Sequence, residues 1–306
     1  MRCLLAFFGL VALVSPAVAP PVVTIGVLRR DAMIVPFATY DGKEWKDYWP
    51  DPRSDVEVPV SLSSVPRRWW GPAEPLAAWQ IWTDSTSQTV HVREPDWLQT
   101  HCQKQIGLRT DYQPREWPPG PDAQPYPKDG LAVSPPQAVQ PIERLTSDSV
   151  EGQGLAEGVR VAFNLREAEG VARAEDDGAN VHPGKKELET LPITIEAAYA
   201  FGTKRRAYWV EATREYKKGA TCGADLFGSG WFLIDADKLA SVVFNVQMVP
   251  CDREGVDYML PLGVMSFPRG VYWIAQWSGW NREEYAIMEI RSKAVVPVLS
   301  VWGGGC

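Results

Sequence analysis

Alternation of apolar and polar residues along the chain predicts many short β-strands. The clearest case is residues 240–248, where Phe244 and Val246 alternate with Asn245 and Gln247. Successive side chains of a strand point to opposite faces, so this segment has one apolar face and one more polar face. Comparable runs separated by turn residues occur at 22–30, 33–40, 78–83, 88–93, 193–201, 207–213, 230–234, 258–267, 271–276, 285–290 and 294–301. The pattern predicts an all-β, mostly antiparallel fold, a sandwich or a barrel, built as one unit or as two β subdomains.

A small β-propeller-like arrangement is the alternative fold. Two segments, GVLRRDAMIVPFATYDG from Gly26 and GVMSFPRGVYWIAQWSG from Gly263, share the order strand, turn, apolar strand, turn. Any two β-hairpins share that order, and the chain shows no repeat of fixed length. The propeller therefore ranks second.

Other segments divide the chain. Residues 1–19 read as a signal peptide, 20–113 as an N-terminal β region and 159–306 as a C-terminal β domain. Between them, 114–158 is rich in Pro and polar residues and predicts a linker or a wrapping loop. Residues 96–105 predict a short helix capped by Asp96, 159–165 a strand, and 167–186 a surface helix or a loop.

The densest aromatic run is residues 270–285, GVYWIAQWSGWNREEY. It predicts a central strand that leaves the core at a turn and returns as a second strand. Trp273 and Trp277 share one strand face, where they form either a platform for sugar rings or core anchors. The core interpretation is favoured, because Trp is mostly buried in folded proteins.

Tryptophan supplies the candidate binding residues. Trp69 and Trp70 are adjacent in a Pro-flanked loop, and Trp277 and Trp280 lie at the end of the aromatic run. Exposed indoles at these positions would form a binding surface for a ligand such as a glycan.

Acidic residues near these aromatics open a catalytic alternative. Glycoside hydrolysis requires two facing carboxyl groups, one with a raised pKa. Candidates are Asp41, Glu44 and Asp47 in the first Trp-rich loop, and Glu283 and Glu284 after the aromatic strand. No separation can be read from sequence, so the catalytic residues are left unassigned and a non-catalytic role is favoured.

Familiar catalytic and cofactor motifs do not occur. The chain has no G-x-S-x-G, no H-E-x-x-H, no correctly spaced phosphate loop and no complete G-x-G-x-x-G. Asp235 and Asp237 lack the glycine and the final Glu of a calcium loop. The sequence therefore predicts no cofactor and no metal site.

The first 19 residues predict export. Arg2 precedes the apolar run 4–14, and Ala17-Val18-Ala19 is a typical cleavage pattern. No later stretch is long and apolar enough for a membrane span. The net charge of -7 disfavours nucleic acid and anionic membranes as partners. The expectation is a periplasmic or secreted protein.

Cysteine usage agrees with an oxidising compartment. Without Cys3, four cysteines remain, and they predict two disulfides. Of the three pairings, Cys222–Cys251 with Cys102–Cys306 is favoured, since Cys222 and Cys251 flank a predicted hairpin.

The sequence is compatible with three functions. The first is non-catalytic binding of an extracytoplasmic ligand or protein partner, for example a glycan. The second is a carbohydrate-active hydrolase with a carboxylate pair, and the third is a structural envelope protein with nearly all Trp buried.

Overall fold

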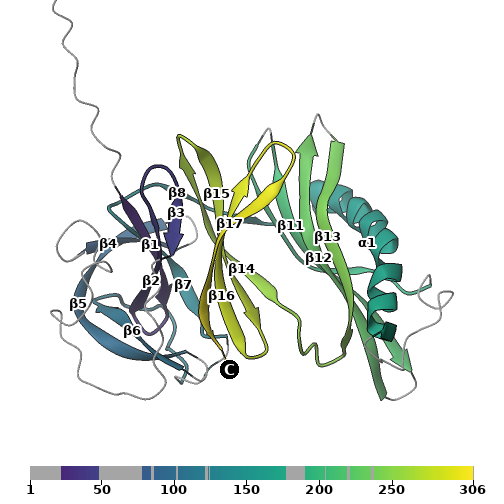
Figure 1. Cartoon of the computed structure of the whole chain (residues 1–306), viewed down its shortest axis with the longest axis horizontal. Helices are drawn as coiled ribbons and strands as arrows, with labels where there is room; N and C mark the ends of the chain where they lie inside the picture. The colour runs from purple at the N-terminus through teal and green to yellow at the C-terminus, as the bar shows by residue number, and fades with distance from the viewer. Residues whose placement is uncertain are drawn as a thin grey trace, which may run out of the picture.

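The computed structural model describes residues 22–47, 78–83, 86–100, 103–120, 123, 125–176, 190–203, 205–218, 221–235 and 238–305. The described part is mostly antiparallel β-structure with one helix, α1 (Val150–Asp176). The predicted all-β fold class is therefore confirmed. The described strands form a barrel and two further sheets rather than propeller blades (Figure 1).

Six strands form a barrel in the order β1-β7-β4-β5-β6-β2, which closes because β2 also pairs with β1. The short strand β3 pairs with the other part of β2 and extends the sheet. The strands predicted at 22–30 and 33–40 are confirmed as β1 and β2, which pair as a hairpin with Ala32 at a positive φ of 65° in the turn. The strands are β1 (Val23–Arg29), β2 (Met33–Tyr40), β3 (Trp45–Asp47), β4 (Ala78–Thr83), β5 (Thr86–Thr100), β6 (Gln103–Thr110) and β7 (Lys128–Ser134).

Two five-stranded antiparallel sheets follow. We call β17-β16-β15-β14-β8 the middle sheet and β13-β12-β11-β10-β9 the outer sheet. The middle sheet comprises β8 (Val139–Gln140), β14 (Tyr258–Phe267), β15 (Gly270–Gly279), β16 (Arg282–Ile290) and β17 (Val295–Gly305). The outer sheet comprises β9 (Glu143–Arg144), β10 (Thr194–Phe201), β11 (Ala207–Lys218), β12 (Thr221–Asp235) and β13 (Lys238–Pro250).

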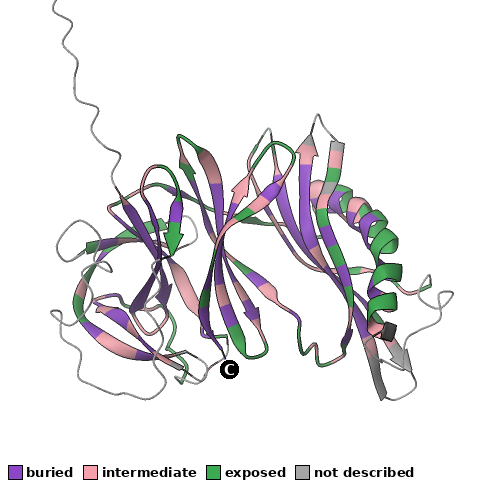
Figure 2. Ribbon diagram, viewed as in Figure 1, coloured by how far each residue is buried: buried purple, intermediate pink, exposed green. Residues whose placement is uncertain are grey.

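Buried side chains show that barrel, middle sheet, outer sheet and α1 are stacked as successive layers (Figures 1 and 2). One face of the middle sheet, with Tyr272 and Ile287, packs against Phe37 and its neighbours on the outside of the barrel. The opposite face, with Trp273, packs against Trp209 of the outer sheet. Each apolar face is thereby covered by another layer, which is how a layered fold buries its core.

Helix α1 includes a segment for which the sequence predicted a strand. The strand expected at 159–165 is wrong, because these residues lie inside α1. Leu155, Val159 and Phe163 recur every four residues and pack on the outer sheet, which is the spacing of one helix face. The alternation of Val159, Val161, Phe163 and Leu165 with Arg160, Ala162 and Asn164 resembles a strand only when this longer repeat is overlooked.

The helix predicted at 96–105 is also wrong, because residues 96–100 form the end of β5 and residues 103–105 form the start of β6. Asp96 faces Gly107 across the two strands, and its carboxylate pairs with Arg109 instead of capping a helix. Leu98 is buried in the cluster outside the barrel. Cross-strand pairing and burial therefore outweigh the local capping signal.

The Pro-rich segment 114–158 contributes a strand to each sheet. β7 closes the barrel between β1 and β4, β8 pairs with β14 in the middle sheet, and β9 pairs with β10 in the outer sheet. The start of α1 follows directly. This segment passes through all three sheets in turn.

Candidate functional site

A row of tryptophans marks the contact between the middle and outer sheets. The ring centroids of Trp209 and Trp231 are 5.1 Å apart, those of Trp231 and Trp273 5.0 Å, and those of Trp209 and Trp277 4.7 Å, all edge to face. Trp273 has no exposed surface, so the core interpretation of this residue holds. Trp277, four residues further along the same face, is only partly buried.

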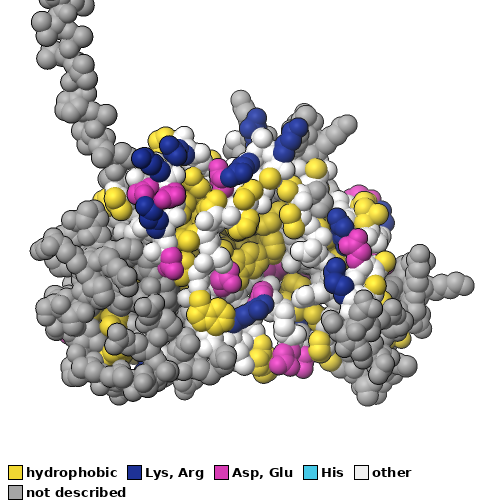
Figure 3. Space-filling view, in the orientation of Figure 1, with side chains coloured by type: hydrophobic (Ala, Val, Ile, Leu, Met, Phe, Trp, Pro, Cys, Tyr) yellow, Lys and Arg dark blue, Asp and Glu magenta, His cyan; other side chains and the backbone are white. Residues whose placement is uncertain are grey.

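Beyond Trp277 the two sheets enclose a polar cavity of about 360 Å³, which we call the inter-sheet cavity. Figure 3 shows hydrophobic side chains gathered on the surface between these sheets, with acidic and basic side chains beside them. The volume lies within the range of small-ligand pockets. The cavity is lined by Phe227, Ser229, Asn245, Gln247, Gly255, Asp257, Trp277, Arg282 and Glu284.

The outer sheet supplies one wall through strand alternation. Ser229 faces Asn245 across β12 and β13, and Phe227 faces Gln247. The intervening residues of β13, such as Val246, are buried against the helix side of the sheet. Because β13 is an edge strand, Asn245 and Gln247 are exposed and can offer their amides to a ligand.

The middle sheet supplies the opposite wall. Trp277 of β15 stands directly opposite Glu284 of β16, and Glu284 stands opposite Trp302 of β17. Directly opposed residues share a sheet face, so a carboxylate lies between two indoles. Trp302 is 45% exposed. The Glu284 carboxylate accepts a hydrogen bond from Ser300 Oγ.

An ion pair closes one end of the cavity. Arg282 Nε donates to Asp257 Oδ1 at 2.8 Å, and Arg282 Nη2 bonds the second oxygen of the same carboxylate. The hydrogen bond to Asp257 raises the pKa of Arg282. Both oxygens of Asp257 are thereby engaged, which leaves Glu284 as the carboxylate of the cavity with the greater freedom to bind a ligand.

A buried acid lies one strand deeper. Glu211 on β11 faces Ser229, is 3% exposed and does not line the cavity. It accepts hydrogen bonds from Trp209 Nε1 at 3.0 Å and from the backbone N–H of Met259 at 2.7 Å. Burial raises its pKa, and the two hydrogen bonds oppose that rise.

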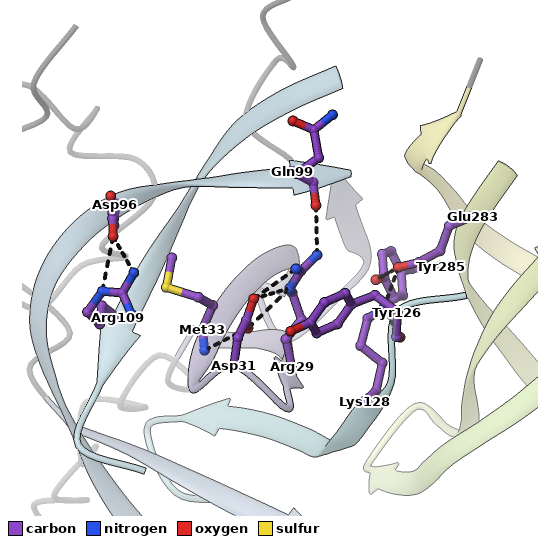
Figure 4. A network of polar contacts seen from close by, with 10 residues as sticks. All are labelled: Arg29, Asp31, Met33, Asp96, Gln99, Arg109, Tyr126, Lys128, Glu283 and Tyr285. Atoms are coloured by element: carbon purple, nitrogen blue, oxygen red, sulfur yellow. Dashed lines mark hydrogen bonds and ion pairs between the residues drawn. The ribbon is translucent and has the colours of Figure 1, made fainter. Parts of the chain in front are cut away.

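Glu283 belongs to a different environment from Glu284, because the next residue of a strand points to the other face. Its carboxylate lies 2.8 Å from Lys128 Nζ and accepts a hydrogen bond from the Tyr285 hydroxyl (Figure 4). Nearby, Arg29 pairs with Asp31 on the barrel. These groups join the barrel to the middle sheet.

The remaining predicted site residues are scattered. Trp280 is 61% exposed in the turn between β15 and β16, next to the cavity but not in its lining. Trp69 and Trp70 lie outside the described residues. Asp41 and Glu44 lie beside β3 on the barrel, where both contact Lys46. The carboxyl of Asp41 has a lowered pKa, chiefly through its hydrogen bond to Lys46.

The sequence reasoning missed Ser229, Asn245, Gln247, Asp257 and Trp302. A usable signal lies in residues 240–248, where Asn245 and Gln247 alternate with apolar residues. The alternation does not show that the polar face, with Asn245 and Gln247, lines a cavity beside a second sheet.

No known protein family matches the sequence, and comparison with curated proteins and with solved structures found no similar protein. Within the described ranges, no group of three or more His, Cys, Asp or Glu side chains could hold a metal ion. The helix that the structure describes lacks the hydrophobicity required to cross a membrane.

Proposed function

We propose that the protein binds a glycan in the inter-sheet cavity without cleaving it. The observation that carries the proposal is the combination of a half-buried indole with amide, hydroxyl and carboxylate groups in one cavity of about 360 Å³. Sugar rings have apolar faces that pack on indoles and hydroxyl groups that pair with amides and carboxylates. Trp277, Asn245, Gln247 and Glu284 supply these two kinds of contact from opposite walls.

A hydrolase is the alternative, since Asp257 and Glu284 line the same cavity. Such an enzyme requires a proton donor beside the scissile bond. Arg282 binds both oxygens of Asp257, so this carboxylate is engaged in an ion pair rather than directed at a ligand. Burial raises the pKa of two described carboxyls near this region, Glu211 and Asp225, but both are buried and neither lines the cavity. These observations favour binding over cleavage.

A purely structural role predicted that nearly all Trp are buried. Trp117, Trp280 and Trp302 are 94%, 61% and 45% exposed, respectively, and two of them lie at the cavity end of the middle sheet. Exposed indoles near a polar cavity support a binding role instead.

The proposal places the protein outside the cytoplasm, on the signal-like pattern of residues 1–19. The predicted Cys222–Cys251 disulfide is part of the same proposal. It is supported by the disulfide-bonded state of Cys251 and by the register, in which Ala224 faces Pro250 and so brings the two cysteines to neighbouring strand ends. Cys102 and Cys306 lie outside the described residues.

The test is titration of the purified protein with a panel of soluble neutral glycans, followed by tryptophan fluorescence and calorimetry. Replacing Asn245 and Gln247 together with Ala removes two exposed hydrogen-bonding side chains from the edge strand. At about 1 kcal/mol per hydrogen bond, the affinity should fall about 30-fold.

Trp277→Ala should also abolish the fluorescence response, whereas Trp117→Ala, which removes an indole that is 94% exposed and outside the cavity lining, should bind normally. A release of reducing ends by the wild-type protein, lost in Glu284→Gln, would instead establish the hydrolase. Absence of binding across the panel, with equal behaviour of all variants, would refute the glycan proposal.

A further inference from the structure

The three opposed residues of the middle sheet indicate how long the ligand is; this step rests on the proposed function. Trp277, Glu284 and Trp302 occupy consecutive strands at directly paired positions. With neighbouring strands about 4.8 Å apart, the Cα atoms of the two tryptophans are separated by about 10 Å. A single sugar ring cannot pack on both indoles at once.

Trp302 lies outside the cavity lining, on edge strand β17. Its indole packs against a glycine that has no side chain to displace it. A Cβ atom added at Gly305 would overlap the Trp302 ring. The ring therefore occupies the space over Gly305, on the strand position that pairs with Arg282. The second indole thus borders the ion pair that closes the cavity.

The charges of the lining select against acidic ligands. Asp257 and Glu284 carry two negative charges against the one positive charge of Arg282. A carboxylate or sulfate on the ligand would meet a net negative site that is partly screened from water. Hydroxyl groups, in contrast, can donate to Glu284 at no such cost.

We infer that the ligand is a neutral oligosaccharide of at least two linked rings, which runs across the strands from Trp277 inside the cavity to Trp302 at its edge. Glu284 accepts hydrogen bonds from the hydroxyl groups between the two indoles. One ring fills the cavity, and the next ring packs on Trp302.

The experiment compares affinities along two neutral series, glucose with its β-1,4-linked oligomers and N-acetylglucosamine with its β-1,4-linked oligomers, against galacturonate oligomers. In the series that binds, affinity should rise about tenfold from one unit to two or three units and then level off. Galacturonate oligomers should bind at least tenfold more weakly than neutral oligomers of equal length.

Trp302→Ala should remove the rise in affinity with oligomer length and leave the affinity for the single sugar unchanged. Gly305→Ala, which keeps the indole but displaces it, should reduce the same gain, whereas Trp117→Ala should leave it intact. Affinity that does not depend on chain length, or an equal loss of monomer and oligomer binding in Trp302→Ala, would overturn the inference while glycan binding stands. Absence of binding in both neutral series and in the wider panel would overturn the proposed function itself.

Discussion

Replacing Glu283 with Gln should destabilise the junction between barrel and middle sheet. The Lys128 side chain is 1% exposed and Glu283 6% exposed, and their charged atoms are 2.8 Å apart. Burial lowers the pKa of Lys128, and Glu283 opposes that effect. Glu283→Gln keeps the size of the side chain and an acceptor for the Tyr285 hydroxyl, but it leaves the ammonium without its counter-charge.

The expected cost is about 3–5 kcal/mol, the usual consequence of removing one partner of a buried ion pair. Adding Lys128→Met removes the orphaned charge, so the double variant should recover much of that loss. The cost should also depend on pH. A lysine with a lowered folded-state pKa reduces stability most below that pKa, and the penalty fades as the pH rises toward 10.5, the ordinary value.

The assay is urea unfolding of wild type, Glu283→Gln and the double variant, followed by tryptophan fluorescence at several pH values. Glu157→Gln is the matched control, because Glu157 pairs with Arg160 on the exposed side of α1, where both side chains are more than half exposed. Its unfolding midpoint should not move. If Glu283→Gln behaved like this control, or if the double variant were less stable than the single one, the account of the buried pair would be wrong.

Two further predictions concern the contact between the two sheets. Glu211→Gln removes a carboxylate whose charged form is disfavoured by burial, and it retains an acceptor for Trp209 and Met259. The variant should therefore be more stable than the wild type at neutral pH. Because the folded-state pKa of Glu211 is raised, this advantage should vanish as the pH falls to 4.5, its ordinary value, in thermal melts; parallel pH profiles would contradict the assignment. Trp273→Ala should cost about 3–5 kcal/mol in urea unfolding, as expected for a fully buried indole, whereas Trp117→Ala should leave the midpoint in place. Equal midpoints for these two variants would show that Trp273 is not a core anchor.

Local pattern was sufficient to predict most of the strands. The β1–β2 hairpin and the β15–β16 hairpin each combine an alternating or apolar run with a clear turn, so their pairing is encoded within about 20 residues. The shared face of Trp273 and Trp277 follows from the same periodicity.

Features that depend on distant segments could not be predicted in this way. Closure of the barrel requires β7, from a Pro-rich segment, to pair with β1 and β4. The inter-sheet cavity requires Asn245 and Glu284 to face each other from separate sheets. No local signal distinguishes a polar strand face that meets solvent from one that meets another sheet.

The central position of the middle sheet has a consequence for how the chain acquires its structure. Four of its five strands, β14 to β17, follow all strands of the barrel and of the outer sheet in sequence. Until these strands are available, the apolar surfaces around Phe37 and Trp209 have no covering layer. The chain must therefore reach its final hairpins before either flanking layer can bury the face that packs on the middle sheet, and a chaperone that shields those two surfaces would prevent premature association.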